Sequence, residues 1–480
     1  MNTRLSTYIN TLNKMSDAAK AAFWYIVCNF LQKGITLLTT PLFTRMLTTD
    51  QYGVFSIYQS WYAIISIFAT LNLSYGVYNK ALTEYNKEKN ALTASFLNLS
   101  STITLLLLLL YFVNRGFWNS ILGLPTVLVI TMFLQLFFEP AFLFWAVNER
   151  YQYRYKKLIA FTLTTAIGGV FLSLAAVMLS THKAEARIIP NAFLQIVFGF
   201  AFYIYIMIKG KRFFSRKYWS FALKFNVPLI PHYVSQTILN QADRIMISKL
   251  DSIENAAVYS VAYQISMVLS LLIGAINNSF IPFTYQSIKE NKIKQLKQTA
   301  DYIVILIGAL TVLVTAAGPE IIKIFAAPQY YNAIWIIPPV TLSTFFIFLY
   351  SLFGNIEFYF IETKYVSIAS CIGGLLNIIL NYLAIPIFGY YAAGYTTLIC
   401  YVIFTLLHYL FYLKVKKKHM PDVEFYNAKK WLYLSAAIIL VMFFITLLYR
   451  TTLIRYSLIL LSLLVVYWKR KKIIKMISWK

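Results

Sequence analysis

The sequence predicts an all-α polytopic membrane protein with fourteen transmembrane helices. Of its 480 residues, 59% are hydrophobic and only 12% are charged, and its mean hydropathy is +0.64. In an ordinary soluble domain, charged residues alone make up about a quarter of the chain. Apolar stretches recur from end to end, each long enough to cross a bilayer core of about 30 Å, which takes roughly 20 helical residues. Composition and pattern therefore both predict an integral membrane protein.

The predicted spans follow one another with short loops between them, none long enough to hold an extramembrane catalytic domain. Their first residues lie near Phe23, Gly53, Ala91, Ile121, Tyr155, Ile188, Ala222, Ala256, Thr299, Tyr330, Tyr365, Tyr390, Trp431 and Leu453. Any function must therefore be carried out by the helices and their short connections, which favours transport over catalysis.

The distribution of lysine and arginine predicts the topology. About three quarters of the 43 basic residues fall in the two termini and the even-numbered loops, and short cytoplasmic loops retain positive charge. Both termini are therefore expected in the cytoplasm. Two termini on the same side of the membrane require an even number of spans. Basic clusters beside the spans, such as residues 209–217 and 414–418, are expected to contact anionic membrane lipids.

An internal repeat divides the chain into two lobes. Residues 50–56 (DQYGVFS) resemble residues 254–260 (ENAAVYS), and residues 71–75 (LNLSY) resemble residues 276–280 (INNSF). Both matches displace the chain by six spans, so the lobes should be pseudo-symmetric about an axis along the membrane normal, with a cleft between them. The predicted domains are an interfacial leader (1–20), an N-lobe of spans 1–6 (21–210), a C-lobe of spans 7–12 (211–414), and spans 13–14 with a basic cytoplasmic tail (415–480).

Several function classes are disfavoured. The net charge of +26 resides in short loops, with no polar domain that could hold a nucleic acid. The three cysteines lie in separate spans, the four histidines form no HExxH pattern, and no phosphate-binding glycine loop occurs. We therefore predict no catalytic residues, no metal site and no cofactor, and a protein that is not an enzyme.

Ionisable residues inside the predicted spans are the candidate functional residues, because a charge at the bilayer centre costs roughly 2.5–3.5 kcal/mol on insertion scales. Lys33 lies near the middle of span 1. Asn29, Lys33, Thr36 and Thr40 recur at helical spacing, which predicts one polar stripe along a helix that lines a wet cavity.

Span 7, at the start of the second lobe, repeats this arrangement with Gln236, Asn240, Asp243 and Arg244. The alternative for Asp243 and Arg244 is that they pair with other groups and serve packing. Glu139 in span 4 could take up and release a proton.

Two further carboxylates, Glu357 and Glu362, border the inner ends of spans 10 and 11. There we expect solvated interfacial residues, and the alternative is a role in coupling or in contact with lipid headgroups.

In order and spacing, several segments together resemble the polysaccharide or O-antigen flippases, which belong to the multidrug/oligosaccharidyl-lipid/polysaccharide exporter superfamily. The resemblance covers nearly the whole chain and rests on residues 41–47 (PLFTRML), 52–53, 231–244, 259–260, 280–282, 377–381, 385–386, 389 and 392–394.

The resemblance implies transport of undecaprenyl-diphosphate-linked oligosaccharide from the cytoplasmic to the outer leaflet of the bacterial inner membrane, for surface polysaccharide biosynthesis. It implies alternating access through a cationic central cavity. Lys33 and Arg244 are the candidates for binding the diphosphate, with Asn29, Gln236 and Asn240 as polar contacts. Glu139 and Asp243 are the candidates for coupling to H⁺ or Na⁺, and a glycan polymerase of the same pathway is a candidate partner.

Three alternatives stay open. A cation-coupled multidrug exporter of the same superfamily should have an acidic cavity, which Lys33 disfavours. A peptidoglycan lipid-precursor flippase shares the cationic cavity. An intramembrane glycosyltransferase or glycan polymerase needs a large catalytic loop, which this chain lacks.

Overall fold

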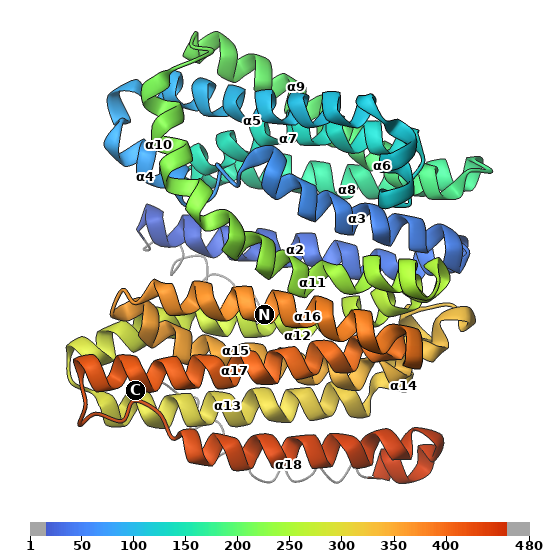
Figure 1. Cartoon of the computed structure of the whole chain (residues 1–480), viewed down its shortest axis with the longest axis vertical. Coiled ribbons are helices and arrows are strands. Elements are labelled where there is room, and N and C mark those ends of the chain that lie inside the picture. Colours follow the sequence, from blue (N-terminus) through green and yellow to red (C-terminus); the bar gives the residue numbers. More distant parts are fainter. Residues whose placement is uncertain (1–15, 458–480) are drawn as a thin grey trace, which may run out of the picture. The chain divides into compact units, whose positions relative to one another are not determined.

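The computed structural model describes residues 16–457, and these form α-helices and short 3-10 turns without any strand (Figure 1). Ten of the helices in this range are long and apolar enough to cross a membrane. Three further helices, α2, α3 and α11, have 30, 22 and 21 residues but are not among those ten. The all-helical multi-pass fold expected from composition is confirmed.

Contacts between Cα atoms divide the chain into two compact units, Met1–Thr237 and Ile238–Lys480. This boundary lies within α11, whereas the repeat suggested a boundary at 210/211. The helices of unit 1 are α2 (Asp17–Met46), α3 (Thr49–Thr70), α4 (Val77–Glu84), η1 (Asn86–Glu88), α5 (Lys89–Val113), α6 (Arg115–Leu122), α7 (Thr126–Tyr151), α8 (Tyr155–Leu179), α9 (Lys183–Gly210), α10 (Arg216–Asn226) and η2 (Val227–Leu229).

Unit 2 begins within α11 (Ile230–Leu250). It continues with α12 (Ile253–Lys289), α13 (Ile293–Ala316), α14 (Gly318–Phe325), η3 (Pro328–Trp335), α15 (Ile337–Tyr359), α16 (Thr363–Phe388), α17 (Tyr391–His419), α18 (Ala428–Leu447) and η4 (Leu448–Arg450). Figure 1 shows the long helices of each unit running side by side.

The same helix pairings recur inside each unit. In unit 1, α9 packs most extensively on α7 and α8, and in unit 2, α17 packs most extensively on α15 and α16. A short helix also stands between the third and fourth long helices of each unit, namely α6 in the first and α14 in the second. The two units therefore have the same internal order of helices, as a repeat of six long helices requires.

Local sequence explains where individual helices start. At the start of α3, the Thr48 hydroxyl accepts a hydrogen bond from the Gln51 amide N–H at 3.3 Å, and the Thr48 amide N–H donates to Gln51 Oε1 at 3.1 Å. This capping box satisfies two backbone donors that would otherwise lack partners. It lets α3 begin only three residues after α2 ends.

The core of unit 2 surrounds α15, whose side chains Phe345, Phe348 and Leu352 are fully buried. Helix α18 lies beside α13 (Figure 1). Asp301 of α13 holds it there, because its carboxylate accepts hydrogen bonds from Lys430 Nζ at 2.8 Å and Trp431 Nε1 at 2.7 Å. A thirteenth long helix is thereby fastened to the six that precede it.

Three predicted span starts are wrong. Spans expected near Ile121, Ala222 and Tyr330 begin instead at α7, α11 and α15, because the separate elements α6, α10 and η3 precede them. Hydropathy alone does not separate a short amphipathic helix from the span that follows it. The predicted leader lies mostly outside the described residues, and α2 already begins at Asp17. The fourteenth span, expected near Leu453, lies almost entirely outside them.

Candidate functional site

A cluster of buried polar side chains around Asp243 joins four helices of unit 2. Asp243 comes from α11, Tyr259 from α12, Asn377 and Asn381 from α16, and Thr397 from α17. Each is at most 1% exposed. Asn377 and Asn381 are four residues apart and so share one face of α16. We call these five residues the Asp243 cluster.

Hydrogen bonds from all four neighbours converge on the Asp243 carboxylate. Oδ1 accepts from Asn381 Nδ2 at 2.7 Å and from Asn377 Nδ2 at 3.1 Å. Oδ2 accepts from the Thr397 hydroxyl at 2.7 Å and from the Tyr259 hydroxyl. A carboxylate can accept about four such bonds, so the cluster uses its whole capacity. The oxygen atoms of Asp243, Thr397 and, after amide rotation, the two asparagines are the ligand type that hard cations prefer.

Arg244, next in the chain, engages other partners. It is 7% exposed, and its Nη1 donates to the Asn240 carbonyl at 2.6 Å and to Gln241 Oε1 at 2.9 Å. Its guanidinium lies 4.4 Å from the centre of the Tyr263 ring, and the Tyr263 hydroxyl donates to Asn240 Oδ1 at 3.0 Å. Arg244 and Asn240 are thus brought together. Gln236 is half-buried on the same helix, within unit 1.

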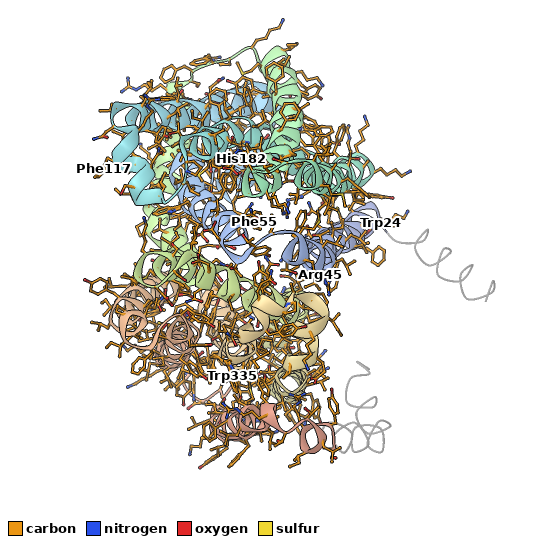
Figure 2. The ribbon with its side chains drawn as sticks, turned by 90° about the vertical axis from the view of Figure 1, so that its right-hand side faces the viewer. Trp24, Arg45, Phe55, Phe117, His182 and Trp335 are labelled. Atoms are coloured by element: carbon orange, nitrogen blue, oxygen red, sulfur yellow. The ribbon has the colours of Figure 1, made fainter. Side chains whose placement is uncertain are left out.

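The predicted stripe on α2 is partly observed. Asn29, Lys33 and Thr36 are exposed, but Thr40 is buried and donates a hydrogen bond to the Thr36 carbonyl at 3.0 Å. Figure 2 labels Trp24 and Arg45, which lie on either side of this stripe in the sequence of α2. Lys33 forms no hydrogen bond or ion pair with another described residue. A bare cation therefore lies on the face of a 30-residue helix.

Glu139 lies beside a second buried polar cluster, in unit 1. The Tyr58 hydroxyl of α3 donates to Gln135 Oε1 of α7 at 3.0 Å, and Gln135 Nε2 donates to Gln195 Oε1 of α9. Glu139, one turn after Gln135, is partly buried, and its Oε2 has no hydrogen-bond partner among the described residues. The following Pro140 has no N–H and so cannot continue the helical hydrogen-bond ladder at this point.

The site residues that sequence reasoning missed are the partners of Asp243. Tyr259, Asn377 and Asn381 entered the resemblance only as family motifs, and Thr397 was not named. The available signal was the pair of asparagines one turn apart inside an otherwise apolar span. The sequence did not show that these asparagines bind Asp243, because that carboxylate lies on a helix more than 100 residues earlier in the chain.

The expectation that Glu357 and Glu362 are solvated is wrong. Glu357 is 0% exposed and Glu362 is 8% exposed. Glu362, in the turn between α15 and α16, accepts hydrogen bonds from Lys418 Nζ at 2.5 Å and from the His419 ring at 3.3 Å, both at the end of α17. These two bonds, with nearby Lys364, lower the pKa of Glu362 from its usual value to about 2. The contact ties the turn between α15 and α16 to the end of α17.

Acid is expected to remove the stabilisation that Glu362 provides. Because its pKa is lower in the folded chain than the usual value of about 4.3, the contribution is complete above about pH 4.3 and is lost as the pH falls through about 2. The difference in thermal unfolding temperature between the native chain and Glu362→Gln should therefore be largest near neutral pH and vanish near pH 2.

Glu424→Gln is the matched control, because Glu424 is 69% exposed and forms an ion pair with Lys297 at 3.3 Å. Its unfolding temperature should follow that of the native chain at every pH, since exposed pairs contribute about 0–1 kcal/mol. A Glu362→Gln difference that stays constant from neutral to strongly acidic pH would contradict the assignment.

The ten membrane-length apolar helices of the described residues, arranged in two units of the same helix order, define a multi-pass membrane protein. Residues 18–288 match the model of a family described as polysaccharide biosynthesis protein. Residues 228–383 match the MatE family model. Because the first model covers more than half of the chain, the chain belongs to that family, and the resemblance to the polysaccharide flippases is confirmed.

Relatives and solved structures agree with this assignment. The chain is 24% identical to Lsg locus putative protein 1 of Haemophilus influenzae over 74% of this chain and 88% of that protein. It is 22% identical to an uncharacterized membrane protein of Methanocaldococcus jannaschii over 86% of each. Its fold resembles that of the lipid II flippase MurJ in an inward closed conformation, with a TM-score of 0.68, 20% identity, and 93% and 99% of the two chains covered. It also resembles an inward-facing multidrug resistance MATE family transporter, with a TM-score of 0.57, 12% identity, and 82% and 96% covered.

Proposed function

We propose that this protein is a flippase that moves undecaprenyl-diphosphate-linked oligosaccharide from the cytoplasmic to the outer leaflet of the bacterial inner membrane. Family membership supports a role in polysaccharide biosynthesis. In this proposal, fourteen spans form two pseudo-symmetric six-helix lobes (21–210 and 211–414) and two C-terminal helices, with both termini in the cytoplasm. The lobes alternate access to a cationic central cavity, and a glycan polymerase of the same pathway receives the product.

Lys33 is the observation that carries the proposal. It is exposed on α2 and has no acidic partner among the described residues. An unpaired cation in a membrane helix is costly, so its presence favours an anionic ligand. A diphosphate supplies that charge, and the neighbouring exposed Asn29 offers a polar contact to the first sugars. A cavity for cationic drugs would need the opposite sign at this position.

Arg244 is the second proposed contact of the diphosphate. In the structure its guanidinium is occupied by the Asn240 carbonyl, Gln241 and the Tyr263 ring. Binding a phosphate would exchange these neutral acceptors for a charged one, which makes a shorter and stronger hydrogen bond. Gln236 and Asn240 on the same helix would then contact the glycan.

Asp243 and Glu139 are the proposed coupling residues, one in each unit. Each is a carboxylate beside a buried polar cluster, and each could bind H⁺ or Na⁺. Each elementary charge that crosses 100 mV supplies about 2.3 kcal/mol. An ion bound at Asp243 would compete with the four donors that now converge there, so its binding would alter the packing of α11 against α16 and α17.

A flippase for a peptidoglycan lipid precursor is the second candidate. The structure with a TM-score of 0.68 to this chain is described as a lipid II flippase. Lipid II and the proposed cargo would present the same diphosphate chemistry, so the two candidates differ in the glycan. Direct comparison of the two lipids is needed to separate them.

Substituting Lys33 or Arg244 with alanine is expected to slow lipid translocation by about tenfold each, since loss of one charge-assisted hydrogen bond of about 1.4 kcal/mol changes an equilibrium tenfold. The measurement is transbilayer movement of a fluorescent undecaprenyl-diphosphate oligosaccharide in proteoliposomes. Lys294→Ala is the control, because Lys294 is an exposed lysine in the first turn of α13 and should leave the rate unchanged.

Each other outcome replaces part of the proposal. Faster movement of fluorescent lipid II than of the oligosaccharide lipid would assign the protein to peptidoglycan precursors. Export of cationic dyes without movement of either lipid would make it a multidrug exporter. Normal rates in both folded alanine variants would remove Lys33 and Arg244 from the binding site.

A further inference from the structure

A buried pair of ionisable side chains lies in unit 2, separate from the Asp243 cluster. Glu357 of α15 is 0% exposed and His408 of α17 is 1% exposed. Their Oε1 and Nδ1 atoms are 2.9 Å apart, within hydrogen-bond distance. Neither residue belongs to the proposed contacts with the lipid or to the coupling candidates above.

Two polar atoms of the pair lack hydrogen-bond partners among the described residues. Glu357 Oε2 and His408 Nε2 are both buried, and neither has a hydrogen-bond partner among the described residues. Buried polar atoms without partners are rare in native proteins and point to a functional role or to an ordered water or ion. Among the residues that the structure describes, one hydrogen bond is thus the only polar contact of these two ionisable groups.

The surroundings of the pair are aromatic. The Tyr350 ring stacks on the imidazole at a centroid distance of 5.3 Å, and the Phe404 ring is T-shaped to the imidazole at a centroid distance of 4.7 Å. Tyr401 in turn stacks on Tyr350 at 6.4 Å. The titratable groups resolved beside the imidazole are therefore the Glu357 carboxyl and the Tyr350 phenol.

Charges on the helices packed against α15 and α17 lie toward the helix ends. α12 carries them in its first and last turns, α13 in its first three turns, and α16 and α18 in their first turns; the 3-10 turn η3 has none. The lysines of α17 itself begin at Lys414. The charged residues of α12, α13, α16 and α18 are Glu254, Lys289, Lys294, Lys297, Asp301, Lys364, Lys429 and Lys430.

Counting protons shows what this environment favours. An ionised Glu357 with a neutral His408 carries one net negative charge, whereas one added proton makes the pair neutral, as either carboxylate with imidazolium or carboxylic acid with imidazole. Burying an uncompensated charge costs far more than burying a neutral, hydrogen-bonded pair. The neutral arrangement of the pair is therefore the one that this buried setting favours.

The pair is connected to the Asp243 cluster along one helix. Thr397, Tyr401, Phe404 and His408 follow each other on α17 at spacings of four, three and four residues, and all are buried. That spacing places them on one face. A shift of α17 that changes the environment of Thr397 would therefore also move His408 relative to Glu357.

We propose that Glu357 and His408 form a proton-binding site in unit 2, in addition to the ion-coupling residues. Its use in driving translocation rests on the proposed flippase function, whereas proton binding by the pair does not. Release of the proton requires a conformation in which α15 and α17 admit water.

Magnetic resonance of the full chain in lipid nanodiscs tests proton binding without any transport substrate. Histidine labelled with nitrogen-15 reports the protonation of each ring nitrogen, and glutamate labelled at the carboxyl carbon reports the acid form. The chain has four histidines, so His408→Asn identifies the resonance by its loss. Spectra are recorded at about pH 6 and about pH 8, on either side of the usual histidine range.

The expected result at about pH 6 is either a doubly protonated His408 ring or a protonated Glu357 carboxyl. In Glu357→Gln the imidazolium signal should be lost, because a lone cation would then be buried. A neutral ring beside an ionised carboxylate at both pH values would overturn the proposal. Where the native ring is doubly protonated, an imidazolium signal that persists unchanged in Glu357→Gln would overturn it as well.

Transport assays separate the coupling role from binding. If the lipid moves in proteoliposomes, Glu357→Gln and His408→Asn should abolish its acceleration by an imposed proton gradient. Size-exclusion chromatography and circular dichroism establish that both variants are folded. If proton binding is seen by magnetic resonance but no lipid moves, the flippase proposal fails and the proton site stands.

Discussion

Replacing Asp243 with alanine is expected to lower the free energy of unfolding by about 3 kcal/mol, because it leaves several buried donors without an acceptor. Tyr259, Asn377, Asn381 and Thr397 all donate to this carboxylate. An individual hydrogen bond in a membrane protein is worth on average about 0.6 kcal/mol. Four bonds and their unpaired donors together account for the larger loss. Unfolding of the purified chain by heat, or by titration with a denaturing detergent, measures it.

Asp251→Ala is the matched control. Asp251 follows the C-terminus of α11, is exposed, and accepts hydrogen bonds from Asn255 Nδ2 at 3.0 Å and the Tyr390 amide N–H at 2.8 Å. Water can replace the carboxylate there, so the loss should be about 1 kcal/mol. Asp243→Asn keeps the shape of the side chain and should fold, but lose any response of translocation to an imposed ion gradient. Equal unfolding curves for Asp243→Ala and the native chain would show that the cluster does not hold these helices together.

Replacing Gly199 with alanine is expected to destabilise unit 1 by about 1–3 kcal/mol through overpacking. Gly199 lies on α9 where it crosses α7, the pair of helices with extensive contact in this unit. An added Cβ would lie 2.6 Å from the Phe138 carbonyl oxygen and 2.7 Å from its carbonyl carbon. These are backbone atoms and cannot rotate away, so the two helices must separate. The measurement is again the unfolding midpoint of the purified chain.

Gly274→Ala provides the comparison, since an added Cβ there has no atom of the described residues within 4 Å. Alanine is favoured over glycine in a helix by up to about 1 kcal/mol, so this variant should be as stable as the native chain or more so. If both variants unfold together, steric contact at Gly199 does not limit the approach of α7 and α9.

Hydropathy located most of the long helices but not the short helices and 3-10 turns that precede some of them. It marked the start of α8 at Tyr155, where an apolar run follows a polar turn directly. It misplaced α7, α11 and α15, because each is preceded by a short helix or 3-10 turn with apolar residues of its own. Periodicity over eight residues cannot distinguish such an element from the first turns of a span.

Candidate residues were predictable one helix at a time. Asp243 was recognised because a carboxylate inside a membrane span is costly wherever it points. Its partners were not assigned to a site, because their convergence depends on how α11, α12, α16 and α17 rotate against each other. The same reason explains the error at Glu357. The sequence placed Glu357 at a helix end, whereas the packing of α15 against α17 buries it beside His408.

The sequence by itself determined the membrane class, the long apolar helices and the family resemblance. These follow from composition and short-range pattern, because exposing polar groups to the hydrocarbon of a bilayer costs free energy. Only the tertiary structure decided which polar side chains meet. Burial of Asp243 with four donors, and of Glu357 with His408, depends on packing between helices. A hydrogen bond needs atoms within about 3 Å of each other, and linear spacing does not specify that distance across helices.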